Sequence, residues 1–245
     1  MSVQACAEIV RNGDPDRFLA TMAAPPAART ILFPLYAFNV EVTRAPWVTK
    51  EPMLAQMRLQ WWRDLLGGPR SAKDPARHEV AAALGFLDAG SAALLDGLID
   101  ARHWDIGTDP HADDAALDAY LDATAGNLAW TAARSLGAVE EDAVRRLARA
   151  AGLARYLAAL PALKAAGKRP LTDDSPETVR GLARRYLGDM PRARSLSRPA
   201  RIATLETWQA RPLLTAILRD PARVERGAVG LSEGGKRLRL LAASV

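Results

Sequence analysis

Two groups of aspartates have the spacing that could hold a divalent cation. Asp96 and Asp100 lie four residues apart, and Asp114, Asp118 and Asp122 repeat that spacing further along. Carboxylates four residues apart share one face of a helix, and proteins hold Mg²⁺ through carboxylates and substrate phosphates. The longer series lies off the buried stripe of its segment, which favours a solvated acidic face. Metal binding by Asp96 and Asp100 stays open as an alternative.

A second polar group interrupts the apolar segment "LYAFNVEVTRAPW", residues 35–47. Tyr36 and Asn39 lie on one polar-edged stripe of the predicted helix, while Glu41 and Arg44 lie on another. Because Glu41 and Arg44 are three residues apart, they can pair with each other and satisfy both charges without a ligand. The group is a candidate binding site, but alone it establishes no reaction.

The segment "EPMLAQMRLQWWRDLL", residues 51–66, has an apolar arc too wide for a surface helix. Arg58 falls within this arc, three residues before Trp61, so we predict that its side chain is buried. A buried arginine needs an anionic partner, which Glu41, Glu51 or a bound phosphate could provide. Arg58 and Trp61 are therefore candidate site residues.

Histidine and cysteine contribute little to the possible chemistry. His78, His103 and His111 have no metal-ligand spacing, and Cys6 is the only cysteine, so neither an intrachain disulfide nor a cysteine metal cage can form. Phosphate-loop, dinucleotide-binding and serine-hydrolase motifs are missing from the sequence. These observations favour a reducing compartment and exclude the commonest nucleotide and hydrolase sites.

The elements that position these residues are predicted to be all α-helical. The chain has 245 residues, 49% of them hydrophobic, enough for one domain with a large core. Helices are expected from Asp14 to the Pro25-Pro26 pair, from there to about Arg44, and over 51–67, 75–88, 91–104, 113–136, 140–166, 175–187 and 198–219. Gly137 and Gly167 are expected helix C-caps. We assign residues 1–226 to a single domain and 227–245 to a mobile basic-apolar tail.

Charge is distributed unevenly along the chain, whose net charge is +5. Asp88 to Asp122 holds nine aspartates against one arginine, whereas Arg145 to Arg201 holds fourteen basic residues against four acids. Opposed acidic and basic regions are expected. The basic segment 180–201 has few aromatic residues and no recognition motif, so nucleic acid is not an expected partner. A cytoplasmic location is expected, because the sequence shows neither a secretory signal nor a long apolar span.

Several segments taken in order resemble the squalene/phytoene synthase superfamily, from about Asp14 to about Leu218. They are "DPDRFLATMAAPPAARTILFPLYAFNVEVTR", "EPMLAQMRLQWWRDLL", "LIDARHWDIGTDP", "YLDATAGNLAWTAARSLG" and "AAGLARYLAALPALKAAGKRPL". The resemblance implies a trans-isoprenyl diphosphate synthase-like helical fold around a central cavity. It also implies that Asp105, Tyr120 and Gly126 help to shape the pocket.

The resemblance fails at the residues that perform catalysis in that family. Its catalytic members join two prenyl diphosphates head to head, using two Asp-rich clusters that hold Mg²⁺. Glu41, Thr43 and Arg44 stand where the first cluster is expected, and residues 155–164, where the second is expected, contain no carboxylate. Ionisation of a prenyl diphosphate requires that its leaving group be neutralised. We therefore expect no catalytic residues and no metal cofactor.

The same aspartate-poor pattern is similar to the branch that includes respiratory complex I assembly factors. This implies a binding or assembly protein with a prenyl or other lipid in its cavity and Arg44, Arg58 and Trp61 near the polar end. A respiratory-complex client and an anionic membrane surface are the implied partners, with a peripheral position at the inner membrane. The alternative is an active Mg²⁺-dependent head-to-head prenyltransferase in which relocated acids, Asp96 and Asp100 among them, bind the metal.

Overall fold

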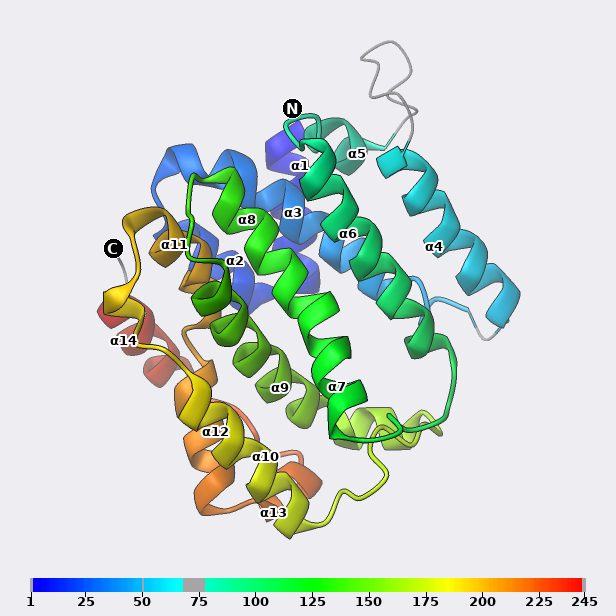
Figure 1. The fold of residues 1–245 in the computed structure, drawn as a ribbon, viewed down its shortest axis with the longest axis vertical. Coiled ribbons are helices and arrows are strands. Elements are labelled where there is room, and N and C mark those ends of the chain that lie inside the picture. The colour runs from blue at the N-terminus through cyan, green and yellow to red at the C-terminus, as the bar shows by residue number, and fades with distance from the viewer. Residues whose placement is uncertain (1, 50, 68–77, 244–245) are drawn as a thin grey trace.

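The computed structural model describes residues 2–49, 51–67 and 78–243, and within these ranges every regular element is a helix (Figure 1). The α-helices are α1 (Ser2–Gly13), α2 (Pro15–Ala23), α3 (Pro26–Arg44), α4 (Pro52–Gly67), α5 (Glu79–Ala83), α6 (Ala89–Ala101), α7 (Asp114–Leu121), α8 (Asn127–Ser135), α9 (Glu141–Ala165), α10 (Pro176–Asp189), α11 (Arg198–Ala203), α12 (Ala210–Arg219), α13 (Ala222–Glu225) and α14 (Glu233–Ala243). Four short segments of tighter or wider winding are η1 (Arg102–Ile106), η2 (Asp122–Gly126), η3 (Ala193–Ser195) and η4 (Thr204–Thr207). The predicted all-α class is confirmed.

Polar residues fix where several helices begin and end. Asp14, Asp88 and Asp113 each accept a hydrogen bond from the backbone N–H three residues on, which satisfies a free donor in the first turn. Gly137 and Gly167 have positive φ angles of 92° and 81° directly after α8 and α9. The predicted C-caps are confirmed, because only glycine adopts this conformation readily.

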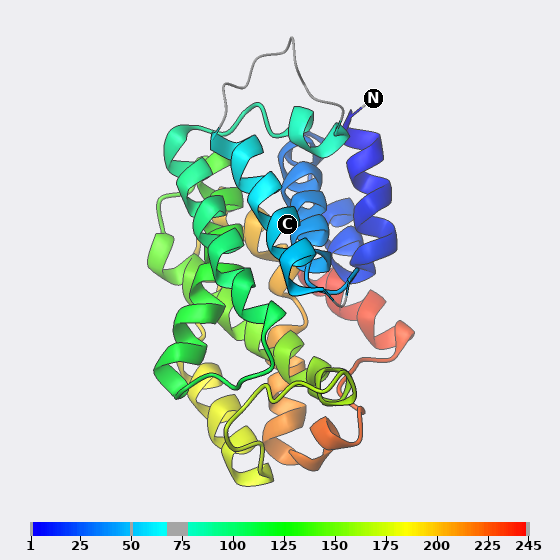
Figure 2. The same cartoon turned by 90° about the vertical axis from the view of Figure 1, so that its right-hand side faces the viewer.

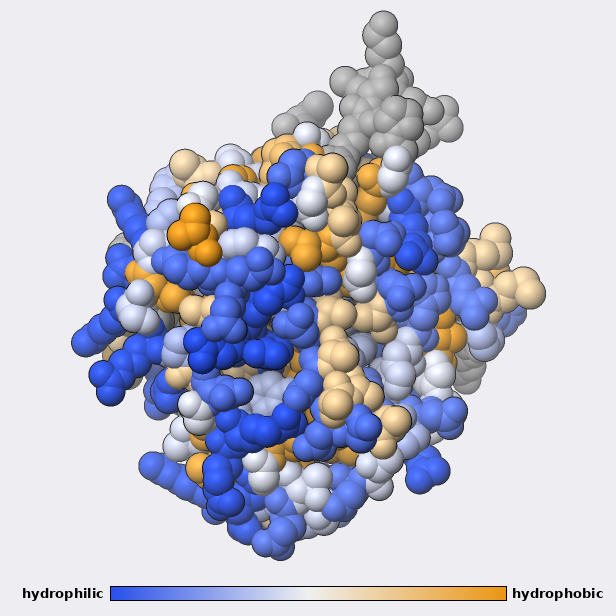
Figure 3. Space-filling view, viewed as in Figure 1, coloured by the Kyte–Doolittle hydropathy of each residue, from blue (hydrophilic) through white to orange (hydrophobic). Residues whose placement is uncertain are grey.

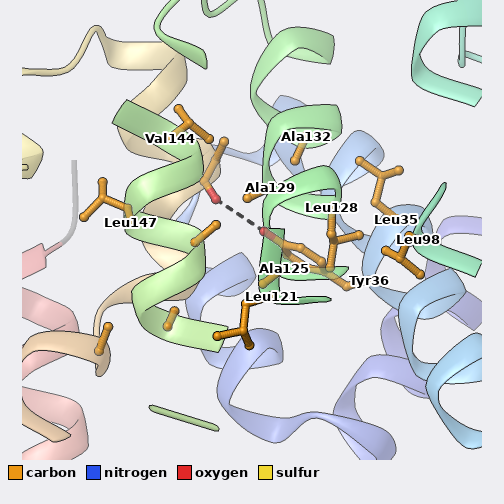
Figure 4. Close-up of a cluster of buried hydrophobic side chains, with 14 of the residues drawn as sticks. Leu35, Tyr36, Leu98, Leu121, Ala125, Leu128, Ala129, Ala132, Val144 and Leu147 are labelled. Atoms are coloured by element: carbon orange, nitrogen blue, oxygen red, sulfur yellow. Dashed lines mark hydrogen bonds between the residues drawn. The ribbon is translucent and has the colours of Figure 1, made fainter. Parts of the chain in front are cut away.

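The core lies where α3, α6, α8 and α9 meet (Figure 4). Leu35 from α3, Leu98 from α6, Leu128 from α8 and Val144 from α9 are almost fully buried in this cluster. Helix α3 is the most enclosed element, because every residue from Leu32 to Val40 is buried. The sequence around residue 36 is therefore mainly core, and its few polar side chains must find partners inside the protein.

Three predicted segments differ from the observed helices. Residues 113–136 wind as α7, the π-helical η2 and α8, and residues 198–219 divide into α11, η4 and α12. In η2, the Thr124 hydroxyl donates to the Tyr120 carbonyl at 2.6 Å. Helix α1 lies before the first predicted helix, and α5 is the described part of 75–88, whose first three residues lie outside the described ranges.

The C-terminal segment carries a helix that contacts the start of the chain. The Lys236 ammonium in α14 lies 2.9 Å from Asp16 in α2, so segments that are far apart in the sequence are neighbours here (Figure 2). Leu240 packs against the edge of the core. The mobility expected for residues 227–245 stays a prediction.

The acidic and basic stretches of the sequence face each other, contrary to the expected separation. Asp122 lies 3.0 Å from Arg145 of α9, and Asp118 lies 2.5 Å from Arg185 of α10. Tyr186 also donates a hydrogen bond to Asp118. The aspartates of α7 and η2 therefore form ion pairs with two neighbouring helices, while Asp114 stays 69% exposed and Asp118 and Asp122 are 33% and 36% exposed.

Candidate functional site

A cavity of about 310 Å³ lies between α3, the α7 and η2 segment, and α9. Its apolar wall includes Leu121, Ala125, Gly152, Ala159 and Leu163. Its polar wall carries Asp14, Arg17, Asn39, Thr43, Arg44, Arg102, Asp105, Tyr120, Arg155 and Tyr156, and two tryptophans, Trp47 and Trp104, complete the lining. The cavity is therefore amphiphilic, with an apolar body and an arginine-rich end.

One end of the cavity is built on a buried ion-pair network. The Arg17 guanidinium lies 3.0 Å from Glu206 and 2.9 Å from Asp14. Arg155 also contacts the Glu206 carboxylate and donates to its carbonyl oxygen at 2.8 Å. Because Arg155 and Glu206 also line a second cavity of about 230 Å³, the network forms the wall between the two spaces.

The charges of this network are held in place by mutual compensation. Burial raises the pKa of Glu206, but the positive charges of Arg155 and Arg17 outweigh it and hold that pKa below its ordinary value. Burial lowers the pKa of Arg17, yet the Glu206 and Asp14 carboxylates raise it by more. Glu206, Asp14 and Arg17 therefore stay ionised at neutral pH.

A second network lies on η1 and α7. Arg102 donates to Asp105 at 3.0 Å and to the Tyr120 hydroxyl at 2.8 Å, and that hydroxyl donates to Asp105 at 2.8 Å. Burial is the main cause that raises the pKa of Tyr120, so the phenol keeps its proton. Asp105 thus accepts hydrogen bonds from both neighbours.

Two polar atoms on cavity-lining residues have no hydrogen-bond partner within the described chain. They are Nε of Arg102 and the hydroxyl oxygen of Thr43, and both are shielded from solvent. A buried polar atom without a partner is unfavourable by about 1–3 kcal/mol. Because neither atom has accessible surface, neither is an open contact point for a ligand in this structure.

An aromatic stack supports the wall formed by η1. The Trp104 ring lies 3.8 Å from that of His111 at an interplanar angle of 10°, and Tyr120 and Tyr156 surround the pair. Burial lowers the pKa of His111 to about 4, so the imidazole is neutral at physiological pH. The neutral His111 ring therefore stacks on the Trp104 ring and supports it.

Four of the predicted site residues line the cavity: Asn39, Arg44, Asp105 and Tyr120. Glu41 pairs with Arg44 at 3.7 Å, as its spacing predicts, but is not part of the lining. Tyr36 is a core residue, because it is only 1% exposed and its hydroxyl donates to the Ala203 carbonyl at 3.4 Å (Figure 4).

Arg58 and Trp61 lie outside the cavity, and the expected burial of Arg58 is wrong. Both side chains are exposed on α4, so Arg58 needs no internal carboxylate or phosphate. The physical reason is that α4 packs through one face alone, whose buried residues are Ala55, Leu59, Trp62 and Leu66.

Gly126 lies in the segment that forms the cavity wall but does not line the cavity itself. It is buried in η2, and a Cβ added to it would lie 2.8 Å from an Asp122 carboxylate oxygen, too close for any other residue without a shift. The predicted role in shaping the pocket therefore becomes one of close packing, at a position that is not part of the lining.

Asp96 and Asp100 also lie away from the cavity. Arg63 of α4 binds both oxygens of Asp96 at 2.8 and 2.9 Å and approaches Asp100 at 3.5 Å. Hydrogen bonding from Arg63 is the main cause that lowers the pKa of Asp96. Both carboxylates are thus engaged by a cation in the position where a metal ion would have to bind.

The described residues contain no group of three or more histidine, cysteine, aspartate or glutamate side chains that could hold a metal ion. The two carboxylates that line the cavity, Asp14 and Asp105, are each bonded to an arginine. This donor set does not match the several free oxygen ligands that Mg²⁺ requires.

Sequence reasoning missed the residues that dominate the polar wall, Arg17, Arg102 and Arg155. Distant partners explain part of the omission, because Arg17 and Glu206 are 189 residues apart and Arg155 and Glu206 are 51 apart. Local signals were present, since Arg17 and Arg102 each have an acid three residues away, and Arg155 opens the segment in which the second metal-binding cluster was expected.

Comparison with known proteins settles the family. The family model for squalene/phytoene synthase matches residues 10–160, more than half of the chain. The chain belongs to the squalene/phytoene synthase family. This squalene/phytoene synthase family member also matches a crystal structure of a dehydrosqualene synthase in complex with ligand, with a TM-score of 0.79 and 14% identity, over 99% of this chain and 95% of that one. That likeness confirms the isoprenoid synthase-like fold.

Two similar proteins are described as complex I assembly factor 6 proteins. The Drosophila melanogaster homolog is 40% identical over 60 residues, which is 24% of this chain and 18% of that protein. The Bos taurus protein is 24% identical over 162 residues, 64% of this chain and 48% of that protein. The chain thus spans at most about half the length of these relatives. Among its described helices, none is long and apolar enough to cross a membrane.

Proposed function

We propose that this family member is a non-catalytic protein that binds one amphiphilic ligand and takes part in the maturation of a respiratory complex. The observation that carries the proposal is the cavity, whose volume of about 310 Å³ is at the lower end of the range for ligand sites, roughly 300–1,000 Å³. Such a space holds one ligand, whereas head-to-head condensation requires two prenyl diphosphates in contact.

The carboxylates support the same proposal. Asp14, Asp105 and Glu206 each contact one or two arginines, so their oxygens already accept charged hydrogen bonds. Freeing one of them for a metal ion would leave an arginine buried and unpaired, which is strongly unfavourable. Mg²⁺-assisted departure of diphosphate therefore has no support at this site.

The lining indicates the kind of ligand that binds. The guanidinium groups of Arg44, Arg102 and Arg155, which line the cavity, offer donors to the oxygens of a head group. Leu121, Ala125 and the other apolar residues of the opposite wall receive a hydrocarbon chain. A prenyl phosphate or another lipid with an oxygen-rich head has this combination.

The assembly role is supported by the relatives, which are described as complex I assembly factors. A scaffold with a ligand cavity but without a metal site suits a protein that recognises a client and a lipid together. Affinity capture of the protein from its native membrane fraction should then recover subunits of a respiratory complex. Capture of prenyltransferase partners without such subunits would contradict this role.

The first experiment is a turnover assay with farnesyl or geranylgeranyl diphosphate and Mg²⁺. We expect no head-to-head product, and we expect farnesyl phosphate to bind at one molecule per chain whether or not EDTA is present. Turnover that Asp96→Ala or Asp100→Ala abolishes would establish the prenyltransferase alternative.

Variants of the polar wall test the ligand orientation. Arg102→Met should weaken farnesyl phosphate binding about tenfold or more, because a charged hydrogen bond contributes about 1.5–3 kcal/mol. Arg58→Met is the matched control, since Arg58 is exposed on α4 and should leave binding unchanged. Equal effects of the two variants would contradict the assignment of the polar end.

A further inference from the structure

Helix α4 has two apolar faces, of which only one is packed. Four of its side chains, Met53, Leu54, Met57 and Trp61, are between 41% and 70% exposed. A helix at a protein surface normally turns polar and charged residues to water, so an outward apolar face indicates contact with something outside the chain.

The exposed apolar surface continues into the turn that precedes α4. Trp47 and Val48 are 45% and 46% exposed, and together with the four residues of α4 they form what we call the α4 patch. Other exposed large apolar side chains of the described residues occur singly or in small groups, such as Leu238 with Leu241. The patch is thus the main concentration of apolar surface within fifteen residues of chain.

The patch is on an open side of the molecule. Helix α4 lies at the edge of the bundle and faces the viewer in Figure 2. In the view of Figure 1, hydrophobic side chains reach the surface over α4 along the right-hand edge (Figure 3). A flat partner could therefore approach α4 from outside.

The patch is continuous with the ligand cavity. Trp47 belongs to both, and Arg44, whose side chain is 61% exposed, lines the cavity beside it. The Lys168 ammonium lies 4.9 Å from the centre of the Trp47 ring. An amphiphile that leaves a surface docked on the patch would meet the arginine-rich end of the cavity next.

Charges around the patch balance. Arg44, Arg58 and Lys168 are cations, and the acids beside them are Glu51, Asp64 and Glu41, which pairs with Arg44. Apolar burial must therefore provide the affinity for a partner.

We propose that the α4 patch docks on a lipid bilayer, with Met53, Met57 and Trp61 at the boundary between head groups and acyl chains. The proposal rests on the proposed function, because docking places the cavity entrance where an amphiphile is available. A bilayer is favoured over a protein partner by this continuity and by the tryptophans, whose amphipathic rings prefer the membrane interface.

Vesicle flotation tests the proposal with the full chain. With vesicles of equal parts phosphatidylcholine and phosphatidylglycerol, the wild type should float and its tryptophan emission should shift to the blue. The triple variant Met53→Gln, Met57→Gln, Trp61→Gln should partition into vesicles at least about tenfold less, because it removes three large apolar side chains from the contact.

The matched control is Leu238→Gln with Leu241→Gln, a pair that is 72% and 73% exposed on α14. This variant should float as the wild type does. Wild-type flotation by the triple variant, or an equal loss in the control, would overturn the proposal. So would complete release of the wild type by high salt, which would show a purely electrostatic contact.

A binding assay without vesicles separates this proposal from the proposed function. The triple variant should bind soluble farnesyl phosphate as tightly as the wild type, because none of its three substituted residues lines the cavity. If the wild type does not float and the triple variant loses a captured protein partner, the patch is a protein-docking site and the bilayer assignment is wrong.

Discussion

Glu206 is the residue on which the polar wall depends most, because one carboxylate compensates two arginines from distant helices. Glu206→Gln should reduce the free energy of unfolding by about 3–5 kcal/mol, since Arg17 and Arg155 then lose their shared counter-charge. Urea unfolding measures this change. The control is Glu141→Gln, which removes an exposed partner of Arg145 and should cost less than about 1 kcal/mol. Similar losses in both variants would contradict the network.

His111 makes stability depend on pH in a definite window. Burial lowers its pKa from 6.5 to about 4, although the charge of Asp105 opposes the shift. An unfolded chain therefore takes up the proton first, so stability is complete above pH 6.5 and falls by up to about 3 kcal/mol as the pH falls toward 4.

The variant His111→Phe keeps a ring against Trp104 but cannot titrate. Its free energy of unfolding should therefore change less than that of the wild type between pH 6.5 and 4.5, above the range in which Glu206 and Asp14 take up protons. Chemical unfolding at several pH values measures the difference, and His103→Phe controls for the loss of a histidine. A wild-type slope in His111→Phe would refute the assignment.

At the scale of single residues, sequence reasoning found part of the cavity lining. Asn39 and Arg44 were predicted from their place in one apolar segment, and Asp105 and Tyr120 from the family resemblance. Arg17 was missed although Asp14 is three residues away, because only the fold brings Glu206 to that pair. Periodicity cannot tell which apolar face is covered, and the prediction for Arg58 was wrong for that reason.

Among the elements, α9 and η2 approach each other unusually closely. A Cβ at Gly152 would lie 2.9 Å from that of Ala125 and 3.3 Å from a Leu121 methyl group. Gly152→Ala should therefore push α9 away from η2, lower stability by about 1–3 kcal/mol and weaken ligand binding, since Gly152 lines the cavity.

Gly181→Ala is the matched test, because a Cβ in this part of α10 meets no atom within 4 Å. It should raise stability by about 0.5–1 kcal/mol through better helix propensity. Thermal unfolding of both variants compares the two effects. A stabilising Gly152→Ala would show that the two segments have room to separate.

Helix ends with side-chain caps were predictable, and irregular winding was not. Asp88 is the N-cap of α6 and Asp113 is the N-cap of α7. Such caps can be predicted because they depend on a few adjacent residues. The π-helical turn at η2 depends on contacts with α9, which no local pattern describes. The apolar arc of residues 51–66 was taken as too wide for a surface helix, and this was wrong: α4 lies at the surface with one side of the arc exposed, because it lacks a neighbour on that side.

At the scale of the whole molecule, contacts between the two ends of the chain tie the bundle together. Arg17 binds Glu206, and Lys236 lies 2.9 Å from Asp16. We expect one cooperative thermal transition in which the calorimetric and van't Hoff enthalpies agree. Scanning calorimetry measures both, and two separate transitions would contradict a single folding unit.

Fold and family were predictable from the order of segments, since many weak local matches in the same sequence reinforce one another. The distribution of charge was not, because linear counts do not tell which stretches pack together. Asp118 and Arg185 belong to stretches of opposite sign that the sequence suggested were apart, yet they form an ion pair between α7 and α10.

The separation of Arg17 and Glu206 in the sequence also determines when their ion pair can form during synthesis. The ribosome adds about 5–20 residues per second, so the 189 residues that separate the two partners take roughly 10–40 s to make. During that interval a nascent chain carries the arginine of α2 without the acid that will enclose it. The first helices must therefore emerge into water, or into a chaperone, with their polar wall unfinished, and this wall closes only after Glu206 has been synthesised.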